Sequence, residues 1–171
     1  MSKIPTLQQA EKTLAANLYT LLVRHHKTRT RIRMQLLIPQ VSTRYFPLTS
    51  QLLLLYLPSI FRSSCYNDDK LPFPQEVTRT ELGHLFEHIL LEYLCIVQLE
   101  RGLDTATYEG RTNWNWVRDP RGTFHITIHT TEEEIPVFRQ ALTRTMTLMN
   151  IILGESDLAS SLTIPSQTTR H

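Results

Sequence analysis

The chain has few cysteines and few glycines, and each shortage excludes a class of protein. Its two cysteines, Cys65 and Cys95, show no paired spacing, so the sequence predicts neither a disulfide framework nor a zinc site built on thiolates. Two isolated thiols are typical of a reducing compartment, and we expect a cytoplasmic protein. The five glycines of the 171 residues form no glycine-rich phosphate loop, which argues against nucleotide-driven chemistry.

Long hydrophobic runs and an excess of one charge are also missing. The apolar stretch QLLLLYLPSIF, residues 51–61, is too short to span a bilayer, and the N-terminus lacks the pattern of a signal peptide. A net charge of +2 is too small to predict a nucleic-acid or membrane partner. Basic residues do crowd between Arg24 and Arg33. This is typical of a solvated face or strand edge, with contact to carboxylates or a polyanion as the alternative.

What the sequence does contain is the composition of an ordinary folded domain. Hydrophobic residues make up 41% and charged residues 20% of a chain long enough for one substantial core. The sequence predicts a single α+β domain, in which a small sheet with antiparallel strands packs against long helices.

The hydrophobic periodicity assigns an element to most of the chain. Capping pairs at Thr78/Glu81 and Thr131/Glu134 mark two helix starts, and Gly102 marks a helix end. Residues after Gly154 read as a flexible tail. The expected elements are a helix over 6–27, a strand over 31–39, a helix over 49–62 broken near Pro58, turns over 63–77, a helix over 78–102, strands over 107–117 and 123–130, and a last helix over 132–153.

One polar stripe interrupts the apolar helix expected at 78–102. His84, Glu87 and His88 lie three and four residues apart, so they share one side of the helix. Two histidines at this spacing can bind one Zn²⁺, and the order H-x-x-E-H is the signature of inverzincin peptidases. The spacing predicts His84 and His88 as metal ligands and Glu87 as the general base. A solvated Glu–His pair on a helix surface is the alternative.

A third ligand has to come from another element. Glu92 and Cys95 lie about 12 Å and about 16 Å beyond His84 along the helix axis, too far to share its ion. The remaining candidates are His129, on the polar face of a strand, and the start of the last helix. That helix start comprises Glu132, Glu133 and Glu134. The alternative interpretation of these three glutamates is an acidic first turn that complements the helix dipole.

Three stretches, taken in order, resemble the N-terminal domain of cyanophycin synthetases. They are LLYLPSIFRSSC at 54–65, ELGHLFEHILLEYL at 81–94, and YEGRTNWNW followed by GTFHITIHTTEEE within 108–134. The likeness covers roughly residues 50–150 and divides the chain into a poorly matched 1–45, a core at 46–155 and a tail at 156–171. The middle stretch is the most specific, because seven positions match in register: Leu82, Gly83, His84, Glu87, His88, Leu91 and Glu92.

The resemblance implies a fold similar to pitrilysin-type peptidases and a zinc site that cuts a peptide-like polymer. The ATP-dependent ligase domains of the family are absent, so polymer synthesis is not expected. By analogy Glu133 and Glu134 would complete the zinc site. Arg111 in the G-R-T stretch, together with Glu92 and His129, would contact substrate, although a strand-end ion pair is the alternative for Arg111. Two departures are His129, where the family has Glu, and Pro136, where it has Gly.

We therefore expect a zinc-dependent hydrolase that cleaves cyanophycin or a related polymer internally. Another divalent metal in place of zinc stays open. One alternative is a non-catalytic module that binds the polymer or assembles with a synthetase. A second is a purely structural metal site, which would need four protein ligands. The sequence leaves open whether the chain forms a homo-oligomer.

Overall fold

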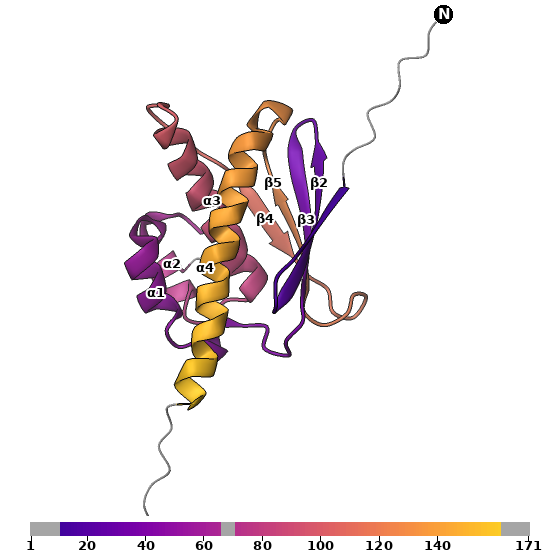
Figure 1. The fold of residues 1–171 in the computed structure, drawn as a ribbon, viewed down its shortest axis with the longest axis vertical. Helices are drawn as coiled ribbons and strands as arrows, with labels where there is room; N and C mark the ends of the chain where they lie inside the picture. Colours follow the sequence, from indigo (N-terminus) through magenta and orange to yellow (C-terminus); the bar gives the residue numbers. More distant parts are fainter. Residues whose placement is uncertain (1–10, 66–70, 162–171) are drawn as a thin grey trace, which may run out of the picture.

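Residues 11–65 and 71–161 are described by the structure, a computed structural model. A five-stranded antiparallel sheet has the strand order β1-β2-β3-β5-β4, and the long helices lie on one of its faces (Figure 1). The predicted α+β class is confirmed. The strands are β1 (Glu11–Ala15), β2 (Tyr19–His26), β3 (Arg29–Leu36), β4 (Gly110–Asn113) and β5 (Thr123–Ile128).

The helix predicted over residues 6–27 is wrong within the described part of the chain. Residues 11–26 form the antiparallel pair of β1 and β2, and residues 1–10 lie outside the described residues. Leu14, Leu18 and Leu21 fit a helical period, but Tyr19, Leu21 and Val23 alternate and are the buried ones. A period of two is that of a strand with one buried face. The N-terminal segment is therefore part of the same sheet as the core.

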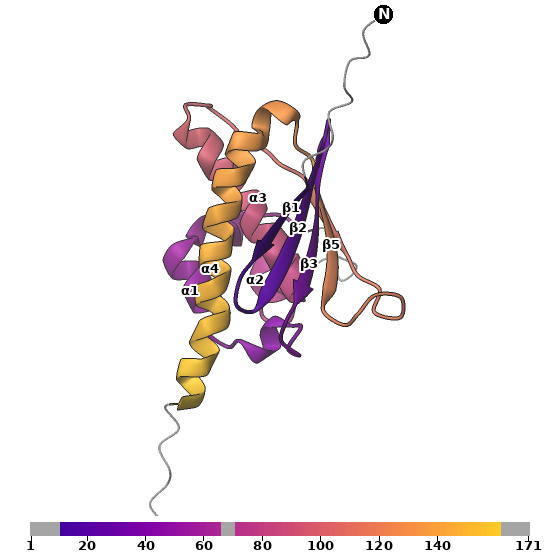
Figure 2. The same ribbon diagram turned by 45° about the vertical axis from the view of Figure 1, so that its right-hand side comes forward.

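Strand β3 confirms the strand predicted near residues 31–39, although it begins and ends earlier. Its side chains alternate between a buried face and an exposed basic one. Figure 2 shows β3 in the sheet between β2 and β5. The exposure of the β3 arginines fits a solvated face and equally leaves them accessible to carboxylates or a polyanion, so both expectations stand. The buried side chains are Thr30, Ile32, Met34 and Leu36, and the exposed ones are Arg29, Arg31 and Arg33.

The short helical segments confirm the break predicted at Pro58. Helix α1 (Thr49–Tyr56) ends before it, and the 3₁₀ turn η2 (Pro58–Arg62) begins on it. A further 3₁₀ turn, η1 (Thr43–Tyr45), precedes α1. Within the segment expected to be all turn, the one-turn helix α2 (Phe73–Glu76) was not predicted, and residues 66–70 lie outside the described residues.

Helix α3 (Leu82–Glu100) is the central helix. Its N-cap residue is Glu81, so the capping box expected at Thr78 is wrong, since the Thr78 hydroxyl donates to the carbonyl of Gln75 instead. The stop at Gly102 is confirmed, because this residue has a φ of +92°, which glycine adopts without strain. By length and apolarity α3 would also pass for a membrane-spanning helix, yet much of it is buried inside the fold.

The second hairpin, β4 and β5, is shorter than predicted. The buried face of β5 is confirmed as Phe124, Ile126 and Ile128. Trp114 and Trp116 lie beyond the end of β4, where their rings meet Phe124 edge-on at centroid distances of 5.8 and 5.7 Å. These two tryptophans led to the prediction of a longer strand, but both belong to the loop after β4 and pack on Phe124 from there.

The last helix is confirmed with different ends. A 3₁₀ turn, η3 (Glu132–Glu134), leads into α4 (Ile135–Ser161), and the Glu134 carboxylate accepts a hydrogen bond of 2.8 Å from the backbone N–H of Thr131. Pro136 lies in the first turn of α4, where its missing N–H costs nothing. The helix continues past Gly154 to Ser161, so residues 156–161 are helical and not part of the expected tail, and residues 162–171 lie outside the described residues.

Candidate functional site

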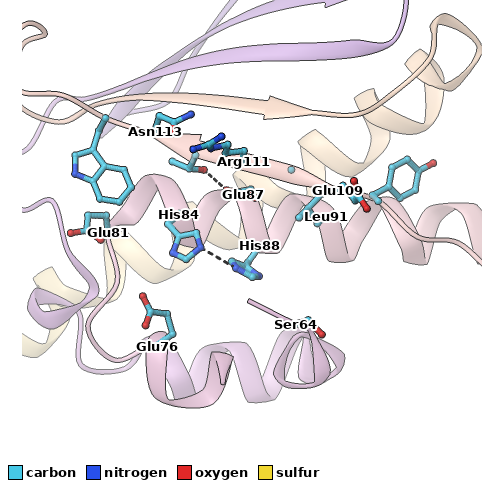
Figure 3. A pocket seen from close by; sticks show the side chains of 14 residues that line it. Ser64, Glu76, Glu81, His84, Glu87, His88, Leu91, Glu109, Arg111 and Asn113 are labelled. Atoms are coloured by element: carbon cyan, nitrogen blue, oxygen red, sulfur yellow. Dashed lines mark hydrogen bonds between the residues drawn. The ribbon is translucent and has the colours of Figure 1, made fainter. Parts of the chain in front are cut away.

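Two histidines from adjacent turns of α3 face one another. Nε2 of His84 and Nε2 of His88 are 3.1 Å apart, and both rings project from the helix toward the segment that carries Ser64 (Figure 3). Two imidazole nitrogens bound to one tetrahedral Zn²⁺ at 2.0–2.1 Å would be roughly 3.3 Å apart. The observed pair therefore fits a shared metal ion.

The surroundings of this pair keep both imidazoles neutral. Burial lowers the pKa of His84, and burial together with the neighbouring His84 lowers the pKa of His88 to about 3. Nδ1 of His84 lies 2.8 Å from the hydroxyl of Thr80, and the His88 ring stacks on Phe73 at a centroid distance of 4.5 Å. A neutral ring offers a lone pair to a metal, and a hydrogen bond at Nδ1 directs Nε2 toward it.

Glu87 points to the other side of the same helix turn, toward β4 (Figure 3). It is only 5% exposed, and its Oε2 accepts a hydrogen bond from the hydroxyl of Thr112. Burial raises the pKa of Glu87 to about 7, and the hydrogen bond from Thr112 lowers it in part. A carboxyl group with a pKa near neutrality can both accept and return a proton under ordinary conditions.

A glycine of β4 leaves room for this carboxylate. A Cβ added at Gly110 would lie 2.9 Å from Oε1 of Glu87 and 2.8 Å from the end of the Ile128 side chain. Any other residue at position 110 would therefore push on Glu87. The G-R-T stretch of the sequence thus supplies both the space and, through Thr112, the hydrogen bond that position Glu87.

One open pocket of about 810 Å³ joins the imidazoles and Glu87. Of the residues singled out by the sequence, His84, Glu87, His88 and Arg111 line it. Charges of both signs surround the three central groups, since Arg111 is accompanied by several carboxylates. The other polar and aromatic lining residues are Ser64, Glu76, Glu81, Tyr108, Glu109, Thr112, Asn113 and Trp114.

The glutamates expected to complete a metal site are engaged elsewhere. Glu134 accepts a hydrogen bond of 2.7 Å from Tyr108 and lies within 3.5 Å of the Gln98 amide. Gln98 is ten residues beyond His88, about 15 Å along the helix axis. Glu132 and Glu133 are exposed on the same 3₁₀ turn. The structure does not bring Glu132, Glu133 or Glu134 to the histidines.

The other expected substrate contacts also lie apart from the pocket. His129 is at the end of β5, where its Nδ1 is 3.8 Å from a carboxylate oxygen of Glu109. Glu92 lies one turn beyond His88 and does not line the pocket, whereas Leu91 does. Neither residue meets the imidazole pair.

A thiol that the sequence analysis had set aside lies beside the imidazole pair instead. Sγ of Cys65 is 3.5 Å from Nε2 of His84. Among the described residues, the group able to hold a metal ion is Cys65, His84 and His88, whose ligand atoms all lie within 4.8 Å of one another. The sequence indicated no thiolate site, whereas the structure places Cys65 among the groups that could hold an ion. No spacing rule reveals Cys65, because a loop brings it to the helix.

Neither a family model nor a curated protein matches this chain.

Proposed function

We propose that this protein is a metal-dependent hydrolase that cleaves amide bonds inside a peptide-like polymer of the cyanophycin type. His84 and His88 hold the ion, and Glu87 is the general base. The observation that carries the proposal is that two neutral imidazoles in ligand geometry share one pocket with a buried carboxyl group whose pKa is about 7.

Each group has a chemical task in such a reaction. A divalent ion supplies Lewis acidity at the scissile carbonyl and toward water. Glu87 takes a proton from the attacking water and delivers it to the leaving amine, which a carboxyl group titrating near neutrality does best. Thr112 and the space at Gly110 hold the Glu87 carboxylate in one orientation.

The charges of the pocket support a substrate that carries both signs. Arg111 offers a guanidinium group to a carboxylate, and Glu81 and Glu109 offer carboxylates to a cationic side chain. Cyanophycin, with an aspartate backbone and arginine side chains, has both kinds of group. The pocket is also open, which suits a chain that enters along its length rather than by an end.

The test is to incubate purified protein with cyanophycin and to measure new amino termini, beside a Glu87→Gln variant. We expect cleavage by the wild-type protein and its loss in Glu87→Gln, with bound metal retained by both. Glu100→Gln, at the exposed far end of the same helix, is the matched carboxylate-to-amide control and should cleave normally. Bound metal with no cleavage would favour the alternative, a module that binds the polymer without cutting it.

A further inference from the structure

In the pattern that the sequence resembles, glutamates at the start of the last helix complete the metal site. This chain departs from that pattern at the third ligand. The helix supplies two ligands one turn apart, and geometry prevents it from supplying more. Of the glutamates of η3, Glu134 is held at the other end of α3 by Tyr108 and Gln98, and Glu132 and Glu133 are exposed. Among the described residues, the further group within reach of both histidines comes from the loop after η2, on the side opposite Glu87.

That loop is anchored so that its cysteine reaches the imidazoles. Ile60 of η2 is fully buried, and the backbone N–H of Ser63 donates to its carbonyl at 3.0 Å. Phe61 packs against Phe73, the ring on which His88 stacks. Cys65 follows this anchor by two residues, and its Sγ is directed at Nε2 of His84.

The distances match those of a mixed sulfur and nitrogen site. With Zn–S near 2.3 Å and Zn–N near 2.05 Å at tetrahedral angles, sulfur and nitrogen ligands would lie roughly 3.6 Å apart. The observed Sγ–Nε2 distance to His84 is 3.5 Å, and the two nitrogens are 3.1 Å apart. Two of the three distances between ligand atoms are thus nearly those of one tetrahedral site, and the third, from the Cys65 sulfur to His88, is no longer than 4.8 Å.

We propose that the Cys65 thiolate is the third protein ligand, so that the ion is bound by one sulfur and two nitrogens. Three protein ligands leave a fourth position for water or substrate, as in catalytic zinc sites. Thiolate ligation selects zinc, cobalt and other soft or borderline ions over magnesium, calcium and manganese. It also makes the site sensitive to thiol reagents. The assignment rests on the proposed metal site but not on the hydrolysis reaction.

Cobalt substitution tests the assignment without any substrate. Co²⁺ bound through a thiolate has an intense sulfur-to-cobalt charge-transfer band in the near ultraviolet. We expect this band in the wild-type protein and its loss in Cys65→Ser. Metal affinity in Cys65→Ser should fall by more than the roughly 10–100-fold that loss of an outer-shell partner costs. Circular dichroism of the metal-free variant checks that it is folded.

The chain supplies matched controls for both competing ligands. Cys95→Ser removes the other thiol, and Glu134→Gln removes the carboxylate that the family pattern would use. Both should keep the band and the affinity of the wild-type protein. A band that survives Cys65→Ser, or an affinity that falls in Glu134→Gln, would overturn the assignment.

The outcome separates this assignment from the proposed function. A thiolate band without polymer cleavage would leave Cys65 as a ligand and remove the hydrolase. Cleavage that depends on metal, in a protein without the band, would keep the hydrolase and remove Cys65 from the ion.

Discussion

At the scale of single residues, the burial of Glu87 works against the stability of the fold. Its carboxyl group is nearly fully buried, and one hydrogen bond from Thr112 offsets only part of the loss of water. Such a group weakens the fold whenever it is ionised. A residue kept at that cost is expected to have a chemical use.

The stability of the metal-free protein should therefore depend on pH through Glu87. Its pKa is about 7 in the folded protein and 4.5 ordinarily, so between these values the folded protein holds a proton that the unfolded chain has released. The free energy of unfolding falls as the pH rises through this window. Glu87→Gln should be more stable than wild type at pH 8, by at most about 3 kcal/mol, and nearly equal to it at pH 5.

Urea denaturation at the two pH values, with a chelator present, measures this difference. Glu100→Gln is the contrasting control. Arg144 lowers the pKa of Glu100 by hydrogen bonding, so removing that carboxylate should give no gain at pH 8. A Glu87→Gln variant no more stable than wild type at pH 8 would contradict the burial of an ionisable Glu87.

The residues of the site differ in how far the sequence could predict them. His84 and His88 follow from spacing alone, since a helix places residues four apart on one side. The same rule placed Glu87 on that side, whereas the structure directs it toward β4. Cys65 and Thr112 come from a loop and a strand whose positions depend on packing. Both residues are present in the sequence, but no pattern in it predicts that they lie close to α3.

At the scale of elements, Gly83 explains how α3 approaches the sheet. A Cβ at this position would lie 2.7 Å from Cβ of Phe124 on β5 and nearer still to its ring. The absence of a side chain lets the first turn of α3 pack directly on this strand. His84 is the next residue, so the same contact sets the position of the first of the two histidines.

Gly83→Ala should accordingly destabilise the protein despite the better helix propensity of alanine. Overpacking costs about 1–3 kcal/mol, against a gain of up to about 1 kcal/mol from propensity. Gly154→Ala, in α4 with no neighbouring atom within 4 Å of the added Cβ, is the matched control and should be neutral or stabilising. Urea denaturation of both variants measures the contrast, and equal shifts would rule out the close contact.

The elements also show why a period of apolar residues can mislead. Leu14, Leu18 and Leu21 repeat as on a helix, but the strand alternation of Tyr19, Leu21 and Val23 prevailed. Pairing with β3 decided between the two, because an isolated pattern carries no information on which partner is available. For α3 the helical and strand patterns did not compete, because its apolar run is too long for a strand.

At the scale of the whole molecule, the site joins two parts of the helical layer. The imidazoles come from α3, whereas Cys65 comes from the loop after η2, so a shared ion would tie the two together. A ligand that binds the folded chain alone stabilises it by mass action. Metal binding should therefore raise the free energy of unfolding of the whole protein.

Zinc should raise the melting temperature of the wild-type protein, and a chelator should reverse the change. At a free zinc concentration of 100 times the dissociation constant, the gain is about 2.7 kcal/mol. His88→Ala should lose most of this gain, while His125→Ala, which removes an exposed histidine paired with Asp119, should keep it. Thermal unfolding followed by circular dichroism gives the comparison. The same rise in both variants would show that zinc binds elsewhere.

By itself the sequence determined the class of the fold, the central helix and the side of it that carries His84 and His88. These depend on local periodicity, on breaks at Pro58 and Gly102, and on the regular geometry of a helix. Only the tertiary structure decided that the first segment forms strands, that Glu134 is held by Tyr108, and that Cys65 lies beside the imidazoles. Each of these depends on contacts between segments distant in sequence, whose free energy is set by packing and not by the order of neighbouring residues.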